Sequence, residues 1–315
     1  MNILITGGTG FLGKALVCNI LTDERMNVVS AVRKLSEQLP SEAEQTVVGD
    51  LLAKTDYAYV LKNIDVIVHT AARVHVMEEN VADPLAEFRK VNVEGTLNLA
   101  RQAAEAGVKR FVFISSIKVN GESTVEGQPF TPDNTYITTD PYGVSKREAE
   151  QGLLALAQET GLEVVMIRPP LVYGPGVKAN FLKMMQTIQK GVPLPLGAIH
   201  NQRSLIALEN LVDFIVLCTD HPKAANQTFL ISDGEDVSTS ELLRKVGKAL
   251  GKPARLMPVP VGLMRFVAKL LGKQAVAERL FGSLQVDSSK ARDLLGWKPV
   301  VNMDEQLKKT VVTLK

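Results

Sequence analysis

A tyrosine and a lysine four residues apart form the clearest catalytic pattern in this sequence. Tyr142 and Lys146 lie in the segment DPYGVSKREAE, and Pro141 is typical of the first turn of a helix. Positions i and i+4 share one helix face, so the phenol and the ammonium are expected to meet. A tyrosine is a poor acid or base at neutral pH, and a neighbouring cation lowers its pKa. The spacing therefore predicts that Tyr142 exchanges a proton with a carbonyl or an alcohol.

Two serines strengthen this interpretation, because a YxxxK pair alone is common on helix surfaces. Ser115 and Ser116 follow the apolar run Arg110–Ile114, and Ser116 precedes Tyr142 by 26 residues. In a parallel sheet, the carboxyl ends of the strands line the ligand crevice, where a hydroxyl can hydrogen-bond a reacting oxygen.

A glycine-rich segment, TGGTGFLGKAL, directly follows the first apolar run. Gly7 permits a tight turn, Gly10 lets the backbone approach a pyrophosphate, and Gly13 lets the next helix pack closely on the strand. The free N–H groups at the start of that helix then face the phosphates. This strand–turn–helix context predicts a dinucleotide site.

The end of the second predicted strand indicates which dinucleotide. An NAD site usually has Asp or Glu there, whereas this chain reads SAVRK, with Arg33 and Lys34. A guanidinium suits a ribose 2′-phosphate, so we predict NADP(H) as the preferred cofactor, with NAD(H) possible. The alternative is that Arg33 is only a solvated loop charge. Asp50 and Leu51 are expected near the adenine, and the run HTAAR ends another strand at the same edge.

The elements that position these residues alternate between strands and helices. Predicted strands are Asn2–Thr6, Asn27–Val32, Gln45–Val48, Asp65–His69, Arg110–Ile114 and Glu163–Ile167. Predicted helices are Leu12–Leu21, Pro84–Ala106, Pro141–Thr160, Asn210–Thr219, Ser238–Leu250, Val261–Leu271 and Asp304–Val312. This order predicts an α/β fold, with a doubly wound parallel sheet of the Rossmann type and a smaller α/β C-terminal substrate domain. We expect residues 1–168 and about 203–234 in the dinucleotide domain, and about 169–202 and 235–315 in the substrate domain.

Composition narrows the function classes. The 315 residues have a net charge of +2, which gives no support to nucleic-acid binding. Cys18 and Cys218 are expected to be buried apolar residues in a reducing compartment, and the four histidines show no metal-ligand spacing. Without a recognisable signal peptide or membrane span, a cytoplasmic enzyme is expected. Residues 258–281 are predicted to be amphipathic, packing on the domain core in preference to contacting a membrane surface.

Several of these motifs together resemble the extended short-chain dehydrogenases, the nucleotide-sugar epimerase/dehydratase group. They are GGTGFLG, DL, HTAAR, VNVEGT with Asn92, SS, PYGVSK and a closing LLGWKP, and the resemblance runs through nearly the whole chain. It implies a Rossmann domain, a small substrate domain and a homodimer, for which helices Pro84–Ala106 and Pro141–Thr160 are the candidate faces. It also implies a catalytic triad, which falls on Ser116, Tyr142 and Lys146.

Departures from the family pattern narrow the set of reactions that this chain is expected to catalyse. The family's 4,6-dehydratases have Asp-Glu directly after the strand-five hydroxyl, whereas this chain has Ile117 and Lys118, so dehydration is not expected. What is left is oxidation or reduction at carbon 4 of a sugar. Leu171 stands where epimerases commonly have asparagine, which argues against an epimerase. Arg33 suits an NADPH that is exchanged at each turnover, which favours a reductase. The segments KANFLKMM, PLPLGAIHNQRSLIALENLVD and RLFGSLQVDSSKA are similar to those of reductases making UDP-N-acetylquinovosamine or UDP-N-acetylfucosamine.

The resemblance thus implies reduction of a UDP-2-acetamido-2,6-dideoxy-4-keto-hexose for surface polysaccharide, such as the O-antigen of lipopolysaccharide. Three alternatives stay open: a UDP-hexose or UDP-N-acetylhexosamine 4-epimerase, a hydroxysteroid- or flavonol-type ketoreductase, and a non-catalytic dinucleotide-binding sensor. The expected cofactor contacts are Gly7, Thr9, Gly10, Phe11, Leu12, Gly13, Arg33, Asp50, Leu51, Thr70, Ala71, Ala72, Asn92, Tyr142, Lys146 and Pro169. The expected contacts to a UDP-sugar are Arg73, Ser116, Lys118, Asn180 and Arg203, and no metal site is expected.

Overall fold

A parallel sheet forms the larger part of the molecule. The computed structural model describes residues 1–74, 83–125, 127–133 and 138–314, so His75, one of the four histidines, lies outside the described residues. Within these ranges the sheet has seven strands in the order β3-β2-β1-β4-β5-β6-β9, all paired in parallel. They are β1 (Asn2–Thr6), β2 (Asn27–Val32), β3 (Glu44–Val47), β4 (Val66–His69), β5 (Arg110–Ile114), β6 (Glu163–Arg168) and β9 (Thr228–Leu230). This confirms the predicted doubly wound fold.

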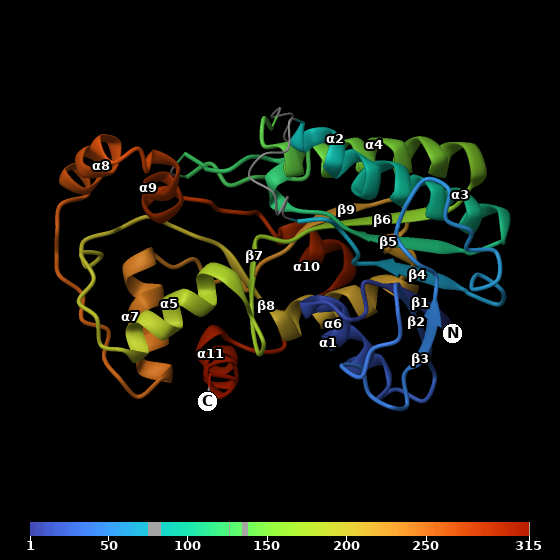
Figure 1. Cartoon of the computed structure of the whole chain (residues 1–315), viewed down its shortest axis with the longest axis horizontal. Coiled ribbons are helices and arrows are strands. Elements are labelled where there is room, and N and C mark those ends of the chain that lie inside the picture. Colours follow the sequence, from blue (N-terminus) through green and yellow to red (C-terminus); the bar gives the residue numbers. More distant parts are fainter. Residues whose placement is uncertain (75–82, 126, 134–137, 315) are drawn as a thin grey trace.

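Helices cover both faces of this sheet (Figure 1). On one face, α1 (Phe11–Ile20) and α6 (Leu208–Asp220) pack on alternate strand residues such as Ile3 and Ile5. On the other face, α3 (Thr96–Glu105) and α4 (Pro141–Thr160) pack on residues such as Leu4. Strands buried on both faces are apolar at nearly every position, which explains why short apolar runs identified them.

The predicted helix at 84–106 contains an irregularity that the periodicity did not reveal. It consists of α2 (Pro84–Arg89), a π-helical segment, η1 (Lys90–Gly95), and α3. Gly95 lies so close to the chain at Leu51 that an added Cβ would stand 2.5 Å from the Leu51 carbonyl oxygen. Glycine at this position therefore lets the helix pass close to the loop after β3, and π turns of this kind frequently mark functional sites.

The C-terminal half builds a second layer around a smaller core. It contains a two-stranded parallel sheet of β7 (Leu171–Tyr173) and β8 (Leu205–Ala207). The helices α5 (Ala179–Gln189), α7 (Thr239–Ala249) and α11 (Met303–Val312) share one apolar cluster with these strands. The short 3₁₀ helices η2 (Ile117–Val119) and η3 (Pro222–Ala224) complete the connections. The predicted domain division stays a prediction, but α10 (Ser289–Leu295) and Trp297 pack in the core of the large sheet.

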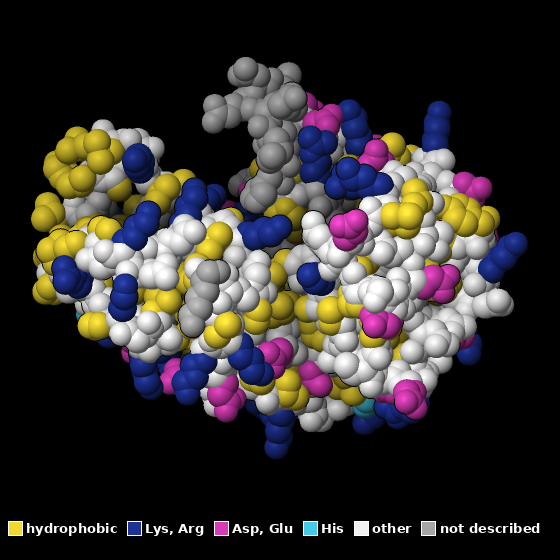
Figure 2. All heavy atoms as spheres, turned by 60° about the horizontal axis from the view of Figure 1, so that its bottom comes forward, with side chains coloured by type: hydrophobic (Ala, Val, Ile, Leu, Met, Phe, Trp, Pro, Cys, Tyr) yellow, Lys and Arg dark blue, Asp and Glu magenta, His cyan; other side chains and the backbone are white. Residues whose placement is uncertain are grey.

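The prediction that residues 258–281 pack on the domain core is wrong for residues 261–270, whereas Ala277 further along is buried. This segment forms two short helices, α8 (Val261–Leu270) and α9 (Gln274–Phe281), separated at Gly272, whose φ of 65° ends the first helix. None of the residues of α8 is buried, and Figure 2 shows apolar side chains gathered at this end of the molecule. The apolar periodicity had identified the helix correctly but could not tell which partner its face meets.

The prediction for the two cysteines holds only for Cys218, since Cys18 is exposed. On α1 the buried positions are Gly13, Leu16, Val17 and Ile20, which places Cys18 on the outward face. Among the helices of the described ranges, none has both the length and the apolar character needed to cross a membrane.

Candidate active site

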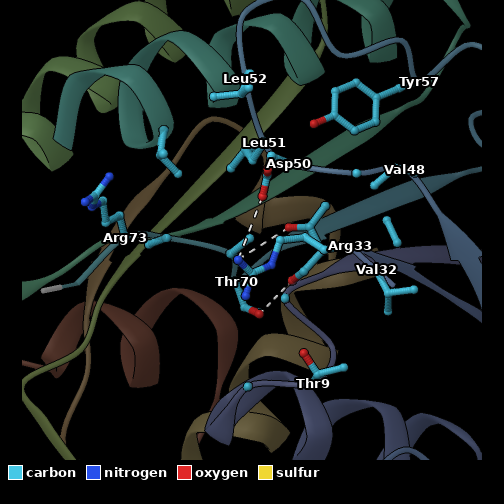
Figure 3. A pocket seen from close by; sticks show the side chains of 18 residues that line it. Thr9, Val32, Arg33, Val48, Asp50, Leu51, Leu52, Tyr57, Thr70 and Arg73 are labelled. Atoms are coloured by element: carbon cyan, nitrogen blue, oxygen red, sulfur yellow. Dashed lines mark hydrogen bonds and ion pairs between the residues drawn. The ribbon is translucent and has the colours of Figure 1, made fainter. Parts of the chain in front are cut away.

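A cavity of about 650 Å³ lies at the carboxyl ends of β1, β2 and β4 (Figure 3). Nine of the residues predicted to contact the cofactor line it together: Gly7, Thr9, Gly10, Arg33, Asp50, Leu51, Thr70, Ala71 and Ala72. The loops after parallel strands meet at one edge of the sheet, which is why positions so far apart in sequence converge here. Tyr57, which the sequence analysis did not single out, also lines this cavity.

The glycine loop has the close packing that its spacing predicts. Gly7 has a φ of 74°, and the Gly10 amide donates to the Gly7 carbonyl over 2.9 Å, closing a tight turn. At Gly13 an added Cβ would stand 2.1 Å from the Gly7 carbonyl oxygen. Phe11 and Leu12 form the first turn of α1 beside this loop.

The N-terminus of α1 suits a phosphate. Its N-cap, Gly10, has no capping side chain, and the first turn holds no acidic residue, so neither competes for the free N–H groups. Gly10 itself is exposed, and a Cβ added there would contact only the Gly7 carbonyl oxygen, at 3.1 Å. The shape and polarity of this end of the cavity therefore fit a dinucleotide pyrophosphate.

Arg33 lies at the end of β2, where it faces Asp50 across the cavity mouth. The Arg33 guanidinium and the Asp50 carboxylate are 3.8 Å apart, and both side chains are largely exposed, at 81% and 69% (Figure 3). Such an exposed pair contributes little stability and leaves the guanidinium free to turn to another anion.

Asn92, in the π segment η1, joins three parts of the site. Its Oδ1 accepts from the Arg73 amide at 2.8 Å, while its Nδ2 donates to the Arg73 carbonyl and to the Ser145 hydroxyl, both at 3.0 Å. Asn92 is buried. These bonds fix the loop after β4 against α4, so the structure gives Asn92 a positioning contact that complements its predicted place near the cofactor.

Two of the catalytic candidates, Ser116 and Lys146, lie close to the end of β5. Lys146 is buried, and its Nζ donates to the Ile114 carbonyl at 2.7 Å and lies 4.2 Å from the centre of the Phe113 ring. Two residues beyond Ile114, Ser116 caps the 3₁₀ helix η2, its hydroxyl accepting from the Lys118 amide at 3.3 Å. The structure therefore brings Lys146 and the end of β5 together.

Gly143, which the sequence analysis did not single out, permits this approach. A Cβ at this position would stand 2.9 Å from the Lys118 carbonyl oxygen, so only glycine lets the first turn of α4 rest on the turn that carries Ser116. Its signal was present in the sequence as the glycine of PYGVSK, directly after Tyr142. The Asp140 carboxylate caps α4 by accepting from the Gly143 amide at 2.8 Å.

The electrostatics of the site differ from the prediction for Tyr142. Loss of water around the phenol raises the pKa of Tyr142 to about 12, and the nearby Asp140 carboxylate acts in the same direction. Burial also lowers the pKa of Lys146 to about 7, against an opposing effect of Glu150. The pKa of Tyr142 is therefore raised and not lowered as predicted, because burial of the phenol and the Asp140 carboxylate both disfavour the phenolate.

A buried histidine network lies behind Lys146. His69 Nδ1 hydrogen-bonds the Thr6 hydroxyl at 2.7 Å, and its Nε2 hydrogen-bonds the Thr96 hydroxyl at 3.0 Å. Burial lowers the pKa of His69 to about 3, and the positive charge of Lys146 adds to this effect. His69 is thus a neutral structural residue. The sequence placed it at the right edge, but nothing in the sequence identified its two threonine partners.

Replacing Lys146 with methionine is expected to change the pH dependence of stability. The pKa of Lys146 is about 7 when folded and about 10.5 when unfolded, so between these values unfolding takes up a proton and stability rises with pH. For wild type we expect the free energy of unfolding to rise by on the order of 1–3 kcal/mol between pH 7 and pH 9. The variant should lack this rise. Urea unfolding across this range measures it, with the exposed Lys308→Met as control. If the free energy of unfolding changed with pH in the same way for wild type and for Lys146→Met, the assignment of Lys146 as a buried, readily deprotonated lysine would be contradicted.

The predicted sugar contacts are spread over a wider region. Arg73 lines the dinucleotide cavity, and its Nη1 donates to Glu87 at 2.8 Å. Lys118 pairs with Asp140 at 3.0 Å, next to the start of α4. Asn180 is exposed in the first turn of α5. The roles of these residues stay predictions.

Arg203 and Pro169 mark the border of the C-terminal layer. The Arg203 Nη1 donates to the carbonyls of Arg279 and Gly282, at 3.1 and 3.0 Å. Burial lowers the pKa of Arg203. The Pro169 carbonyl accepts from the Ile117 amide at 3.0 Å, which holds the end of β6 beside the turn that follows Ser116.

Comparisons with known proteins agree with this architecture. Residues 3–232 match the NAD dependent epimerase/dehydratase family. A UDP-glucose 4-epimerase of Vibrio cholerae is 51% identical over 310 residues, which cover 98% of this chain and 94% of the relative. A 3-beta-hydroxysteroid dehydrogenase of Mycolicibacterium neoaurum is 30% identical over 330 residues, covering 97% of this chain and 89% of the relative.

A solved structure supports the fold. The UDP-glucuronic acid 4-epimerase from Bacillus cereus in complex with NAD has a TM-score of 0.81 at 22% identity, covering 100% of this chain and 96% of its own. The site at the carboxyl edge of the sheet, the 51% identity and the family match thus point to one conclusion. The chain belongs to the NAD dependent epimerase/dehydratase family and is an NAD-dependent enzyme of the extended short-chain dehydrogenase/reductase type.

Proposed function

We propose that this protein is a 4-epimerase of UDP-sugars, with UDP-glucose and UDP-galactose as the first pair to test. The observation that carries the proposal is the 51% identity, over 98% of the chain, to a UDP-glucose 4-epimerase. This differs from the reduction expected from the sequence. That expectation depended on Arg33 and on short segment likenesses, which are weaker evidence than identity through the whole chain.

The proposed roles follow from the placement of the side chains. When bound in the cavity, the dinucleotide supplies a hydride acceptor and donor and, in its oxidised form, a positive charge. Tyr142 takes the proton from the sugar 4-hydroxyl as carbon 4 loses hydride, and it returns that proton after hydride has been delivered to the opposite face of the 4-keto sugar. Ser116 hydrogen-bonds the reacting oxygen, and Lys146 favours the phenolate when it is protonated.

The raised pKa of Tyr142 has a consequence for this scheme. A phenol with a pKa of about 12 holds its proton at neutral pH, so Tyr142 is ready to donate a proton and is a poor base until positive charge comes near it. Positive charge brought by the oxidised dinucleotide, together with protonated Lys146, is what would shift the balance toward the phenolate. Dinucleotide binding and the state of Tyr142 are therefore expected to be coupled.

The test compares two reactions of the purified protein. Interconversion of UDP-glucose and UDP-galactose without added cofactor, followed by chromatography, is the expected result for an epimerase. The control is the same protein supplied with a UDP-4-keto-6-deoxy-N-acetylhexosamine and NADPH, followed by absorbance of the reduced nicotinamide. Stoichiometric loss of NADPH, with no interconversion of the hexose pair, would overturn the epimerase proposal.

One observation keeps a UDP-sugar 4-ketoreductase as the second candidate. Arg33 lies at the end of β2, where an acidic residue would select NAD, and its exposed pair with Asp50 leaves it available to a 2′-phosphate. Reduction of the 2-acetamido-2,6-dideoxy-4-keto sugar would use the same Tyr142 as the proton donor. NADP(H) preference, cytoplasmic location and a homodimer through residues 84–106 and α4 stay proposals in either case.

Replacing Arg33 with alanine tests the cofactor preference. If Arg33 holds a 2′-phosphate, we expect the dissociation constant for NADPH to rise by about tenfold or more, because a charge-assisted contact is lost, while that for NADH stays unchanged. Fluorescence titration with both nucleotides measures this, with the exposed Arg101→Ala on α3 as control. Equal affinities before and after the change would make Arg33 an ordinary surface charge and remove the main argument for NADPH.

A further inference from the structure

The outer face of α8 exposes an apolar stripe. Leu263, Phe266, Val267 and Leu270 follow the i, i+3, i+4, i+7 spacing of one helix face, and Leu271 continues it. Their exposed fractions run from 44% for Val267 to 70% for Leu270. Figure 2 shows apolar side chains gathered at one end of the molecule, and Figure 1 places α8 at the opposite end from the large sheet. Apolar residues gathered in this way mark an interaction surface.

Basic residues accompany this stripe. Arg265 and Lys269 lie on other faces of the same helix, and Lys273 follows its C-terminus. Residues 261–281 hold four basic residues and one acidic residue, a net charge of +3, whereas the whole chain has a net charge of only +2. The one acidic residue, Glu278, is 3.5 Å from Arg265. The two helices therefore combine an exposed apolar stripe with a net positive charge.

We propose that α8 and α9 dock on an anionic lipid bilayer, with the apolar stripe of α8 at the level of the headgroups. Exposed Leu and Phe with Lys and Arg alongside is the composition of helices that lie in a membrane interface, and anionic headgroups complement the net charge of +3. The ten residues of α8 span only about 15 Å, so the helix lies along the surface.

The helices are joined firmly to the layer that carries the predicted sugar contacts. Arg203 donates to the carbonyls of Arg279 and Gly282 at the end of α9, and Asn201 Nδ2 donates to the Gly282 carbonyl at 2.8 Å. The Thr239 hydroxyl donates to the Leu280 carbonyl at 2.7 Å. Docking of α8 would thus bring the C-terminal layer, with Arg203, to the membrane surface.

The test is sedimentation of the full-length protein with vesicles. Wild type is expected to bind vesicles of phosphatidylcholine with phosphatidylglycerol, to bind phosphatidylcholine alone more weakly, and to be released by salt. The double variant Phe266→Ser/Leu270→Ser is expected to lose affinity by about tenfold or more, and Lys269→Glu/Lys273→Glu should abolish the preference for phosphatidylglycerol. Val312→Ser and Lys308→Glu, exposed on or near α11, are the matched controls.

Light scattering and turnover of a UDP-sugar in solution complete the test. Both double variants are expected to fold, to keep the oligomeric state of wild type and to keep its turnover, since none of the replaced residues lines the dinucleotide cavity. This makes the proposal independent of the proposed reaction. Absence of vesicle binding by wild type would overturn it, as would a change from dimer to monomer in the Phe266→Ser/Leu270→Ser variant, which would assign the stripe to a second copy of the chain.

Discussion

Replacing Tyr142 with phenylalanine is expected to lower kcat by about 10²- to 10⁴-fold while dinucleotide affinity stays close to that of wild type. The change removes one hydroxyl at the start of α4 and keeps the ring, whose edge meets Phe88 with centres 5.9 Å apart. With the hydroxyl gone, no phenol is left there to exchange a proton with the sugar oxygen. Turnover measured by chromatography, beside fluorescence titration of the dinucleotide, separates chemistry from binding.

The matched control for this change is Tyr59→Phe. The Tyr59 hydroxyl donates to the Val47 carbonyl at 2.5 Å near the exposed end of β3, outside the catalytic group. We expect the control to retain full turnover. A Tyr142→Phe enzyme within a few-fold of wild type would refute the proposed role and would leave Ser116 or Lys118 as the proton donor to examine.

Replacing Gly13 with alanine, which adds a single methyl group, is expected to have a large effect on both stability and dinucleotide binding. The alanine Cβ would stand 2.1 Å from the Gly7 carbonyl oxygen and 2.8 Å from the Gly8 Cα, and both are backbone atoms that cannot rotate away. Either α1 moves away from β1 or the phosphate loop changes shape. We expect the free energy of unfolding to fall by about 1–3 kcal/mol and dinucleotide binding to be lost.

Gly262→Ala is the control for the glycine prediction, because Gly262 also lies in a helix and has open space around it. Alanine there is expected to leave stability unchanged or slightly higher, since it favours the helix. Urea unfolding and dinucleotide titration of both variants measure the contrast. If Gly13→Ala bound the dinucleotide as wild type does, close packing of α1 on the loop would not be what shapes the phosphate site.

The parts of the fold that sequence could predict were those with a local physical cause. The bounds of β2, β5 and α4 follow directly from short apolar runs and from the Pro141 and Gly161 at the ends of the long helix. The glycine loop was recognisable because its three glycines each have a distinct steric reason. The cavity residues converge because parallel strands all end at one edge.

Other features depended on contacts between distant segments. The π turn at Lys90–Gly95 ends where Gly95 passes the chain at Leu51, and no periodicity within the helix records that encounter. The exposed face of α8 has the same pattern as a buried one, so its partner could not be inferred. The raised pKa of Tyr142 reflects Asp140 and the loss of water, whereas sequence spacing drew attention only to Lys146.

The place of Trp297 also affects how the protein is made. Trp297 packs edge-to-face on Phe214 with ring centres 5.1 Å apart, and its indole donates to Asp213 at 2.8 Å, so the last part of the chain completes the core beneath strands formed by the first. A ribosome adds about 5–20 residues per second, so the first strands wait roughly 15–60 s before this side chain is synthesised. During synthesis, α6 therefore presents an unfilled apolar surface, which a chaperone would be expected to cover until the C-terminus is released.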